Sequence, residues 1–236
     1  GWRPPSRQVL GKEAPPPLSV WSDLREGLAF VRATPVIRAN TLVTLLGPLA
    51  LGAVTPLLVG FAWEVLEGGD WAYAMLGTGI SIGSVIGGLV LSGAKRLRPG
   101  PLVLGGLGLM SLSVMATATI DSHLWLAVGI IALSGLGSML VVIPSVTLVQ
   151  WHTPDRLLGR VFSLRSTLIF AATILSNAVG GWSGETFGVQ VSFFGCGALL
   201  LVFTALAALS PSVRKIDALE PSPQAEDALD EAPLPS

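Results

Sequence analysis

Six long apolar stretches, none containing Asp, Glu, Lys or Arg, constrain this chain most strongly. They run over residues 39–63, 71–94, 99–120, 122–154, 166–184 and 186–213. Each is close to or above the ~20 residues that a helix needs to cross the hydrocarbon core of a bilayer. The chain is also 51% hydrophobic and only 12% charged, which is too apolar for the surface of a water-soluble domain. The sequence therefore predicts an all-α integral membrane protein with six transmembrane helices.

All 14 Lys and Arg residues fall on one side of the membrane that these spans define. The connectors on the opposite side contain only acidic charges, at Glu64, Glu67, Asp70, Asp121 and Glu185. A Lys/Arg excess of this kind marks the cytoplasmic side of a membrane protein. We therefore expect a multi-pass protein with both termini in the cytoplasm.

The two ends of the chain differ in composition from the spans. Residues 1–20 are rich in proline and basic residues, which suits an extended cytoplasmic linker. Residues 21–35 have an apolar stripe opposite arginines and predict an amphipathic helix lying on the inner leaflet. Residues 36–210 form the six-helix bundle. Residues 211–236 are acidic and proline-rich, and they predict a disordered cytoplasmic tail.

Several classes of protein are disfavoured by composition. The net charge of -1, with bases and several acids sorted to opposite faces, does not predict nucleic-acid binding. Cys196 is the only cysteine, and the two histidines, His123 and His152, lie on opposite sides of the predicted membrane. No metal site or cofactor is therefore expected.

Small and polar residues inside the spans recur at helical spacing, so they share faces. Two interpretations remain open: close helix packing, or a polar cavity at mid-membrane. The candidates for a substrate cavity are Thr44, Ser81, Ser134, Ser138, Thr173 and Asn177. The candidates for helix packing are Gly79, Gly83, Gly87, Gly180 and Gly184.

Two short motifs raise the question of catalysis. The run from Gly181 to Gly184 matches a Gly-x-Ser-Gly pattern, and the run from Gly79 to Gly83 matches a nucleophile elbow. Neither histidine lies in a later span able to face Ser183, and Ser81 has neither the strand-turn-helix context of a nucleophile elbow nor an acid partner. We therefore expect no enzymatic activity.

Two segments resemble the major facilitator superfamily of transporters. Thr-Pro-Asp-Arg-Leu-Leu-Gly-Arg-Val at residues 153–161 is similar to the cytoplasmic loop before the eleventh helix of that family. The helix at residues 21–32 resembles the one before the seventh span in its macrolide-exporter-like, drug:proton antiporter branch. The resemblance implies the second half of a two-half bundle, with a gating loop containing Asp155, Gly159 and Arg160. Residues 92–99 keep the basic cluster of the family's other loop motif but lack its acid.

The resemblance implies a secondary transporter of the bacterial cell (inner) membrane that exports a hydrophobic drug or metabolite by alternating access. Its implied partners are an N-terminal six-helix half, membrane lipid, a small-molecule substrate and coupled protons. Because the spans contain no titratable group well inside them, the sequence predicts a largely uncharged cavity wall in this half. The alternatives are a non-transporting membrane scaffold, an inactive truncated half and, last, an intramembrane hydrolase.

Overall fold

The computed structural model describes residues 20–93 and 98–209, and all of its regular elements are helices. The elements, with the π-helical turn η1 among them, are α1 (Val20–Ala33), α2 (Pro35–Leu51), α3 (Val54–Gly60), η1 (Phe61–Val65), α4 (Gly69–Ser92), α5 (Pro99–Thr117), α6 (Leu124–His152), α7 (Asp155–Phe187) and α8 (Val189–Leu209). Six of the helical units are long and apolar enough to cross a membrane, with α2, α3 and η1 together making the first. The predicted all-α fold with six spans is confirmed. The ends 1–19 and 210–236, for which a linker and a disordered tail are predicted, lie outside the described residues.

The fifth span begins earlier than the sequence predicts. Helix α7 starts at Asp155, not at Ser166, so the predicted gating loop is the first part of a 33-residue helix. Pro154 adopts an extended conformation before the first turn, and Asp155 places a negative charge at the positive end of the helix dipole. Leu157 and Val161 are buried on the helix face that continues into the bundle. Residues 155–165 were predicted as a connector because charged residues at both of its ends interrupt the apolar stretch.

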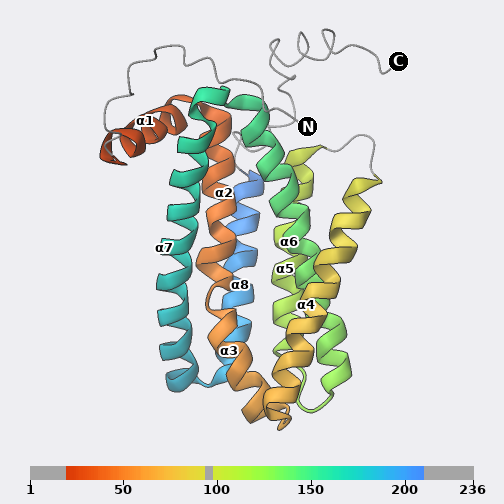
Figure 1. Ribbon diagram of the computed structural model, residues 1–236. Coiled ribbons are helices and arrows are strands. Elements are labelled where there is room, and N and C mark those ends of the chain that lie inside the picture. Colours follow the sequence, from red (N-terminus) through yellow and green to blue (C-terminus); the bar gives the residue numbers. More distant parts are fainter. Residues whose placement is uncertain (1–19, 94–97, 210–236) are drawn as a thin grey trace, which may run out of the picture.

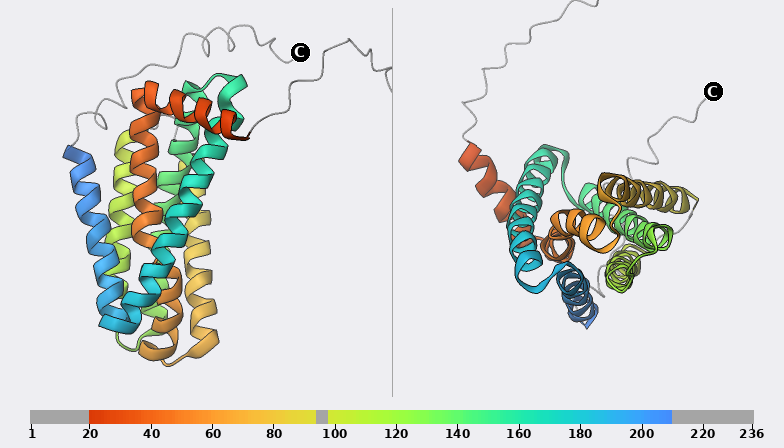
Figure 2. Two further views of the ribbon diagram at one scale, coloured as in Figure 1. Left: turned by 90° about the vertical axis from the view of Figure 1, so that its left-hand side faces the viewer. Right: turned by 90° about the horizontal axis from the view of Figure 1, so that it is seen from below.

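The bundle consists of two groups of helices. Helices α2, α3, α7 and α8 contact one another, and helices α4, α5 and α6 form the second group (Figures 1 and 2). The groups meet chiefly where α5 packs on α8 and α2 packs on α6. In the view along the bundle in Figure 2, α8 lies beside α5, where the two groups meet. A site that collects residues from α2, α6 and α7 therefore lies where the groups meet.

Helices α4 and α6 pack with their backbones in close contact. Gly79, Gly83 and Gly87 are buried on one face of α4 and lie against α6. A Cβ atom at Gly83 would collide with the carbonyl oxygen of Ala132, and one at Gly135 would collide with that of Ile80. Only glycine permits this approach, as in small-residue contacts between membrane helices.

Helix α1 lies across one end of the bundle, beside the start of α7 (Figures 1 and 2). Its Val31 is buried in a cluster with Ile37, Val149, Val161 and Leu164. The helix was predicted at residues 21–35 as one that lies on the inner leaflet. At least this part of its apolar stripe covers the ends of α6 and α7.

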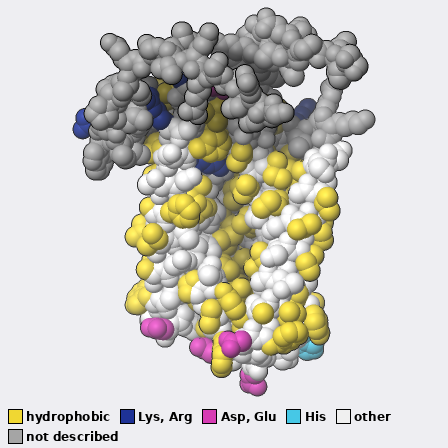
Figure 3. Space-filling model, viewed as in Figure 1, with side chains coloured by type: hydrophobic (Ala, Val, Ile, Leu, Met, Phe, Trp, Pro, Cys, Tyr) yellow, Lys and Arg dark blue, Asp and Glu magenta, His cyan; other side chains and the backbone are white. Residues whose placement is uncertain are grey.

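Charged side chains separate between the two ends of the bundle. Figure 3 shows Lys and Arg near the end that includes α1, and acidic side chains at the opposite end. We call these the basic end and the acidic end. The basic end contains the α6–α7 junction, and the acidic end contains the exposed residues Glu64, Glu67, Asp70, Asp121 and Glu185.

Candidate functional site: a cavity beside a buried arginine

A cavity of about 330 Å³ lies between the two groups of helices. Its wall comes from α2, α5, α6 and α7: Thr44, Gly47, Pro48, Leu51, Gly52, Leu107, Met110, Ser138, Val141, Val142, Arg165, Ile169 and Thr173. The wall is mostly apolar, with one cation and three hydroxyl groups. Apolar walls with a few polar groups are typical of small-molecule sites.

The three hydroxyl groups each donate a hydrogen bond to a carbonyl of their own helix. Thr44 donates to the Asn40 carbonyl at 2.7 Å, Ser138 to Gly135 at 2.6 Å and Thr173 to Ile169 at 2.8 Å. A hydroxyl whose proton is used in this way still has lone pairs on its oxygen. The cavity wall therefore offers hydrogen-bond acceptors from α2, α6 and α7.

Arg165 is the charged member of the cavity wall, and its side chain is only 7% exposed. Its Nη1 donates to the Ser145 carbonyl at 3.3 Å, and its Nη2 donates to the Ser145 hydroxyl. The residue lies about 15 Å along α7 from Asp155, at about 1.5 Å per residue. Ionisable residues buried inside a membrane bundle are costly and commonly functional.

Asn40 of α2 also donates a hydrogen bond to the Ser145 carbonyl. Its side chain is 2% exposed, and its Nδ2 donates to the Ser145 carbonyl at 3.0 Å. One carbonyl of α6 therefore joins α2, through Asn40, to α7, through Arg165. This shared acceptor, the Ser145 carbonyl, orients the guanidinium at the edge of the cavity.

A second interhelical contact lies where α2 ends and α3 begins. The amide of Ala53 donates to the Ser176 hydroxyl at 2.8 Å, and that hydroxyl donates to the Leu49 carbonyl at 2.8 Å. Leu49 and Ala53 are the pair that an uninterrupted α-helix would bond directly. The α7 side chain is thus inserted into the hydrogen-bond ladder of the first span, which is a recognised cause of helix bending.

The predicted cavity residues divide into two sets. Three of them line the cavity together: Thr44, Ser138 and Thr173. Ser81 is exposed in a shallow groove formed by α4 alone, and Ser134 is buried with its hydroxyl on the Ile131 carbonyl at 2.6 Å. Asn177 is partly buried, and its Oδ1 has no hydrogen-bond partner among the described residues. Its neighbour Ser176 occupies the buried interhelical position.

The remaining predicted residues lie outside the cavity wall, either in the first turns of α7 or at contacts between helices. Asp155 and Gly159 are exposed in the first turns of α7, and the Arg160 carbonyl lies next to Gly27 of α1. Gly180 lies against Ala53, and Gly184 lies against Leu57.

Arg165, Asn40 and Ser176 are the residues that sequence reasoning missed. The predicted fifth span started one residue after Arg165, so this cation was assigned to a connector. The cavity wall formed by the spans was therefore predicted to be largely uncharged. The buried arginine corrects that expectation. It could have been found from its spacing, because it follows Leu157 and Val161 at intervals of eight and four on the same apolar face.

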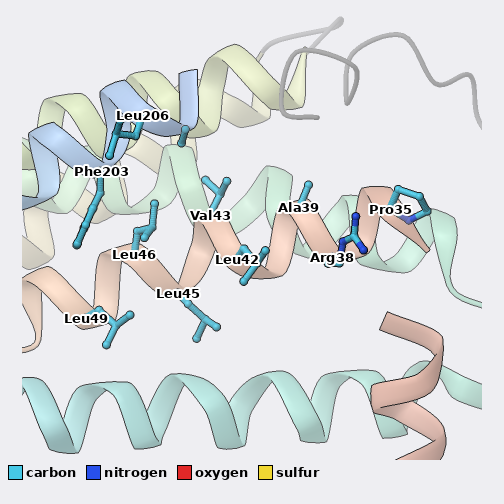
Figure 4. A pocket seen from close by; sticks show the side chains of 11 residues that line it. Pro35, Arg38, Ala39, Leu42, Val43, Leu45, Leu46, Leu49, Phe203 and Leu206 are labelled. Atoms are coloured by element: carbon cyan, nitrogen blue, oxygen red, sulfur yellow. The ribbon is translucent and has the colours of Figure 1, made fainter. Parts of the chain in front are cut away.

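Another cavity, of about 430 Å³, lies between α2 and α8 (Figure 4). Leucine and other apolar side chains from both helices line it, and Arg38 lies at one end beside Pro35. Arg38 is exposed and, among the described residues of this wall, has the only polar side chain. The cavity beside Arg165 is the stronger candidate, because polar groups of three helices converge on it.

The family comparison bears on what such a cavity does. A family model described as "transmembrane secretion effector", within the major facilitator superfamily (MFS), matches residues 6–234. The chain belongs to this MFS family. It is also 28% identical over 200 residues to the uncharacterised MFS-type transporter YfiS of Bacillus subtilis (strain 168). That match covers 81% of this chain and 47% of the relative, so the chain spans about half the length of YfiS.

No solved structure matches the chain. Membership of the MFS family agrees with the six apolar helices of the structure.

Proposed function

We propose that this MFS chain is the C-terminal six-helix half of a secondary active carrier that exports a hydrophobic drug or metabolite by alternating access. The cavity beside Arg165 would be this half's share of the substrate site. The observation that carries the proposal is the convergence of polar groups from α2, α6 and α7 on one largely apolar cavity. The length of the relative YfiS, about twice the matched region, supports a second half.

The proposed partner is an N-terminal six-helix half, with membrane lipid around the remainder. Exposed apolar side chains along α4 and α7, including Val85, Leu89, Phe170 and Ile174, leave faces for both. Among the residues whose side chains the structure describes, no Asp or Glu is buried. Protons are the proposed coupling ion, and the carboxylate that binds them would belong to the other half. Asp155, Gly159 and Arg160, at the basic end of α7, are proposed to form part of the gate.

The proposal is tested by efflux from energised bacterial cells that express the whole carrier. The compounds are one neutral, one cationic and one anionic: chloramphenicol, rhodamine 6G and 4-phenylbutyrate. Expression should lower the accumulation of at least one, and collapse of the proton gradient should abolish the difference. Replacing two wall hydroxyls, in Ser138→Ala with Thr173→Val, should slow efflux about fivefold or more through lost hydrogen bonds.

Thr186→Val is the matched control, since Thr186 is exposed at the acidic end of the same helix as Thr173. It should leave efflux unchanged. Equal accumulation of all three compounds with and without the carrier would contradict export and favour a non-transporting scaffold.

We further propose that the protein spans the inner membrane of a bacterial cell, with its basic end and both termini on the cytoplasmic side. Two single-cysteine variants, one at an exposed serine and one at an exposed glycine, test this orientation in a Cys196→Ala background. Ser122→Cys at the acidic end should react with an impermeant maleimide added to intact cells, whereas Gly93→Cys at the basic end should react only after permeabilisation. The reverse labelling pattern would refute the orientation.

A further inference from the structure

We infer that Arg165 makes the cavity a recognition site for amphipathic organic anions, with a carboxylate or similar group on the guanidinium and an apolar body along the wall. This inference rests on the proposed transport function and names the substrate class. It replaces the neutral substrate that an uncharged wall would favour.

The first argument is the missing countercharge. Both hydrogen bonds of Arg165 go to neutral oxygens of Ser145. These bonds satisfy two donors but leave the positive charge uncompensated, and an uncompensated buried charge is destabilising. No carboxylate is buried among the side chains that the structure describes, and Asp155 on the same helix is exposed. An anion entering the cavity would therefore gain a strong interaction that the described residues do not supply.

The second argument is the number of free donors. A guanidinium has five N–H groups arranged as a planar fork. Ser145 accepts from Nη1 and Nη2 and leaves further N–H groups of the fork for another acceptor. Asn40 fixes the Ser145 carbonyl from α2, so the fork is held in place before a ligand arrives. A carboxylate can then accept two charge-assisted hydrogen bonds from one rigid partner.

The third argument is the composition of the rest of the wall. Apolar side chains dominate it, including Leu107, Met110, Val141 and Ile169. A small inorganic anion would lose its hydration shell here and gain only one charged partner. An organic anion also buries an apolar body, and the volume of about 330 Å³ falls within the range of small-molecule sites. Hydroxyls of Thr44, Ser138 and Thr173 can accept bonds from donor groups on that body.

The experiment compares carboxylates with their uncharged amides on the whole carrier in lipid nanodiscs. The pairs are hexanoate and hexanamide, 4-phenylbutyrate and 4-phenylbutyramide, and naphthaleneacetate and naphthaleneacetamide. Binding is measured by calorimetry, together with the melting temperature. We expect at least one carboxylate to bind about tenfold or more tightly than its amide, as a charge-assisted hydrogen bond predicts. Arg165→Gln should bring that ratio close to one.

Two further variants separate recognition from folding. Arg165→Lys keeps the charge without the fork and should keep part of the preference. Arg38→Gln removes the exposed arginine of the other cavity and should keep all of it. If no carboxylate binds more tightly than its amide in the unaltered carrier, the inference is overturned, whether or not Arg165→Gln folds. A lowered melting temperature of Arg165→Gln in that case would assign Arg165 to a structural role, through its hydrogen bonds to Ser145.

These measurements distinguish a failure of the anion-site inference from a failure of the proposed transport function. Efflux of a neutral compound with no carboxylate preference in binding would sustain the proposed function and overturn this inference. A carboxylate preference that depends on Arg165, in a carrier that moves none of the compounds, would contradict export and leave the anion site standing.

Discussion

Gly83→Ala is expected to destabilise the carrier by about 3 kcal/mol or more, at the upper end of overpacking effects. The added Cβ would overlap the carbonyl oxygen of Ala132 and would lie 3.1 Å from the amide nitrogen of Leu136. Both groups are backbone atoms of α6, so no side-chain rotation can relieve the contact. The helices must separate, and the contact of Gly135 with the α4 backbone would be lost at the same time.

Gly88→Ala is the matched control in the same helix, because no atom lies within 4 Å of the added Cβ. Alanine has a higher helix propensity than glycine, so this variant should be neutral or more stable by up to about 1 kcal/mol. The measurement is the folded fraction after solubilisation and heating, read by size-exclusion fluorescence. Equal melting temperatures for the two variants would show that α4 and α6 are not in backbone contact.

Gly180→Ala and Gly181→Ala should differ in the same way, although they are neighbours in sequence. A Cβ at Gly180 would lie 2.6 Å from the Cα of Ala53 and 2.8 Å from its carbonyl oxygen. Moving α7 away would also stretch the hydrogen bonds through Ser176. We expect a loss of about 2–3 kcal/mol. A Cβ at Gly181 meets no atom within 4 Å.

Efflux adds a second readout for this pair. Gly180→Ala should lower transport per folded molecule, since it displaces α7, which contributes Arg165 and Thr173 to the cavity wall. Gly181→Ala should retain both folded protein and transport. A Gly181→Ala variant that is as unstable as Gly180→Ala would contradict the packing described between α7 and the first span.

The fold followed from the sequence because lipid imposes few solutions. Apolar stretches bounded by charges can only be helices when they cross a membrane, since every backbone group must be bonded within the span. The same rule misplaced the start of α7. Arg156, Arg160 and Arg165 appeared as one basic connector, but Arg165 is accommodated inside the bundle by Ser145. A charged residue ends an apolar stretch without necessarily ending the helix.

The site was less predictable, since it depends on which helix faces meet. Helical spacing groups polar residues on one face of a span, but it does not say whether that face meets a cavity, another helix or lipid. Thr44, Ser138 and Thr173 lie on one cavity, whereas Ser81, chosen by the same spacing argument, lies on the exposed face of α4. On α7, the predicted Asn177 and its neighbour Ser176 point to different sides of the helix, and it is Ser176 that makes the buried hydrogen bonds. Such a difference is decided by tertiary packing.

The hydroxyl of Ser176 gives the first span a bending point that conserves its hydrogen bonds. If the hydroxyl withdraws, the Leu49 carbonyl and the Ala53 amide can bond each other directly, and the serine can bond a carbonyl of its own helix. Two bonds are then lost and two are formed. In hydrocarbon, where an unpaired backbone group costs several kcal/mol, an even exchange leaves no backbone group unpaired in either arrangement. The first span and α7 can thus change their mutual tilt through a swap of partners instead of by breaking a helix.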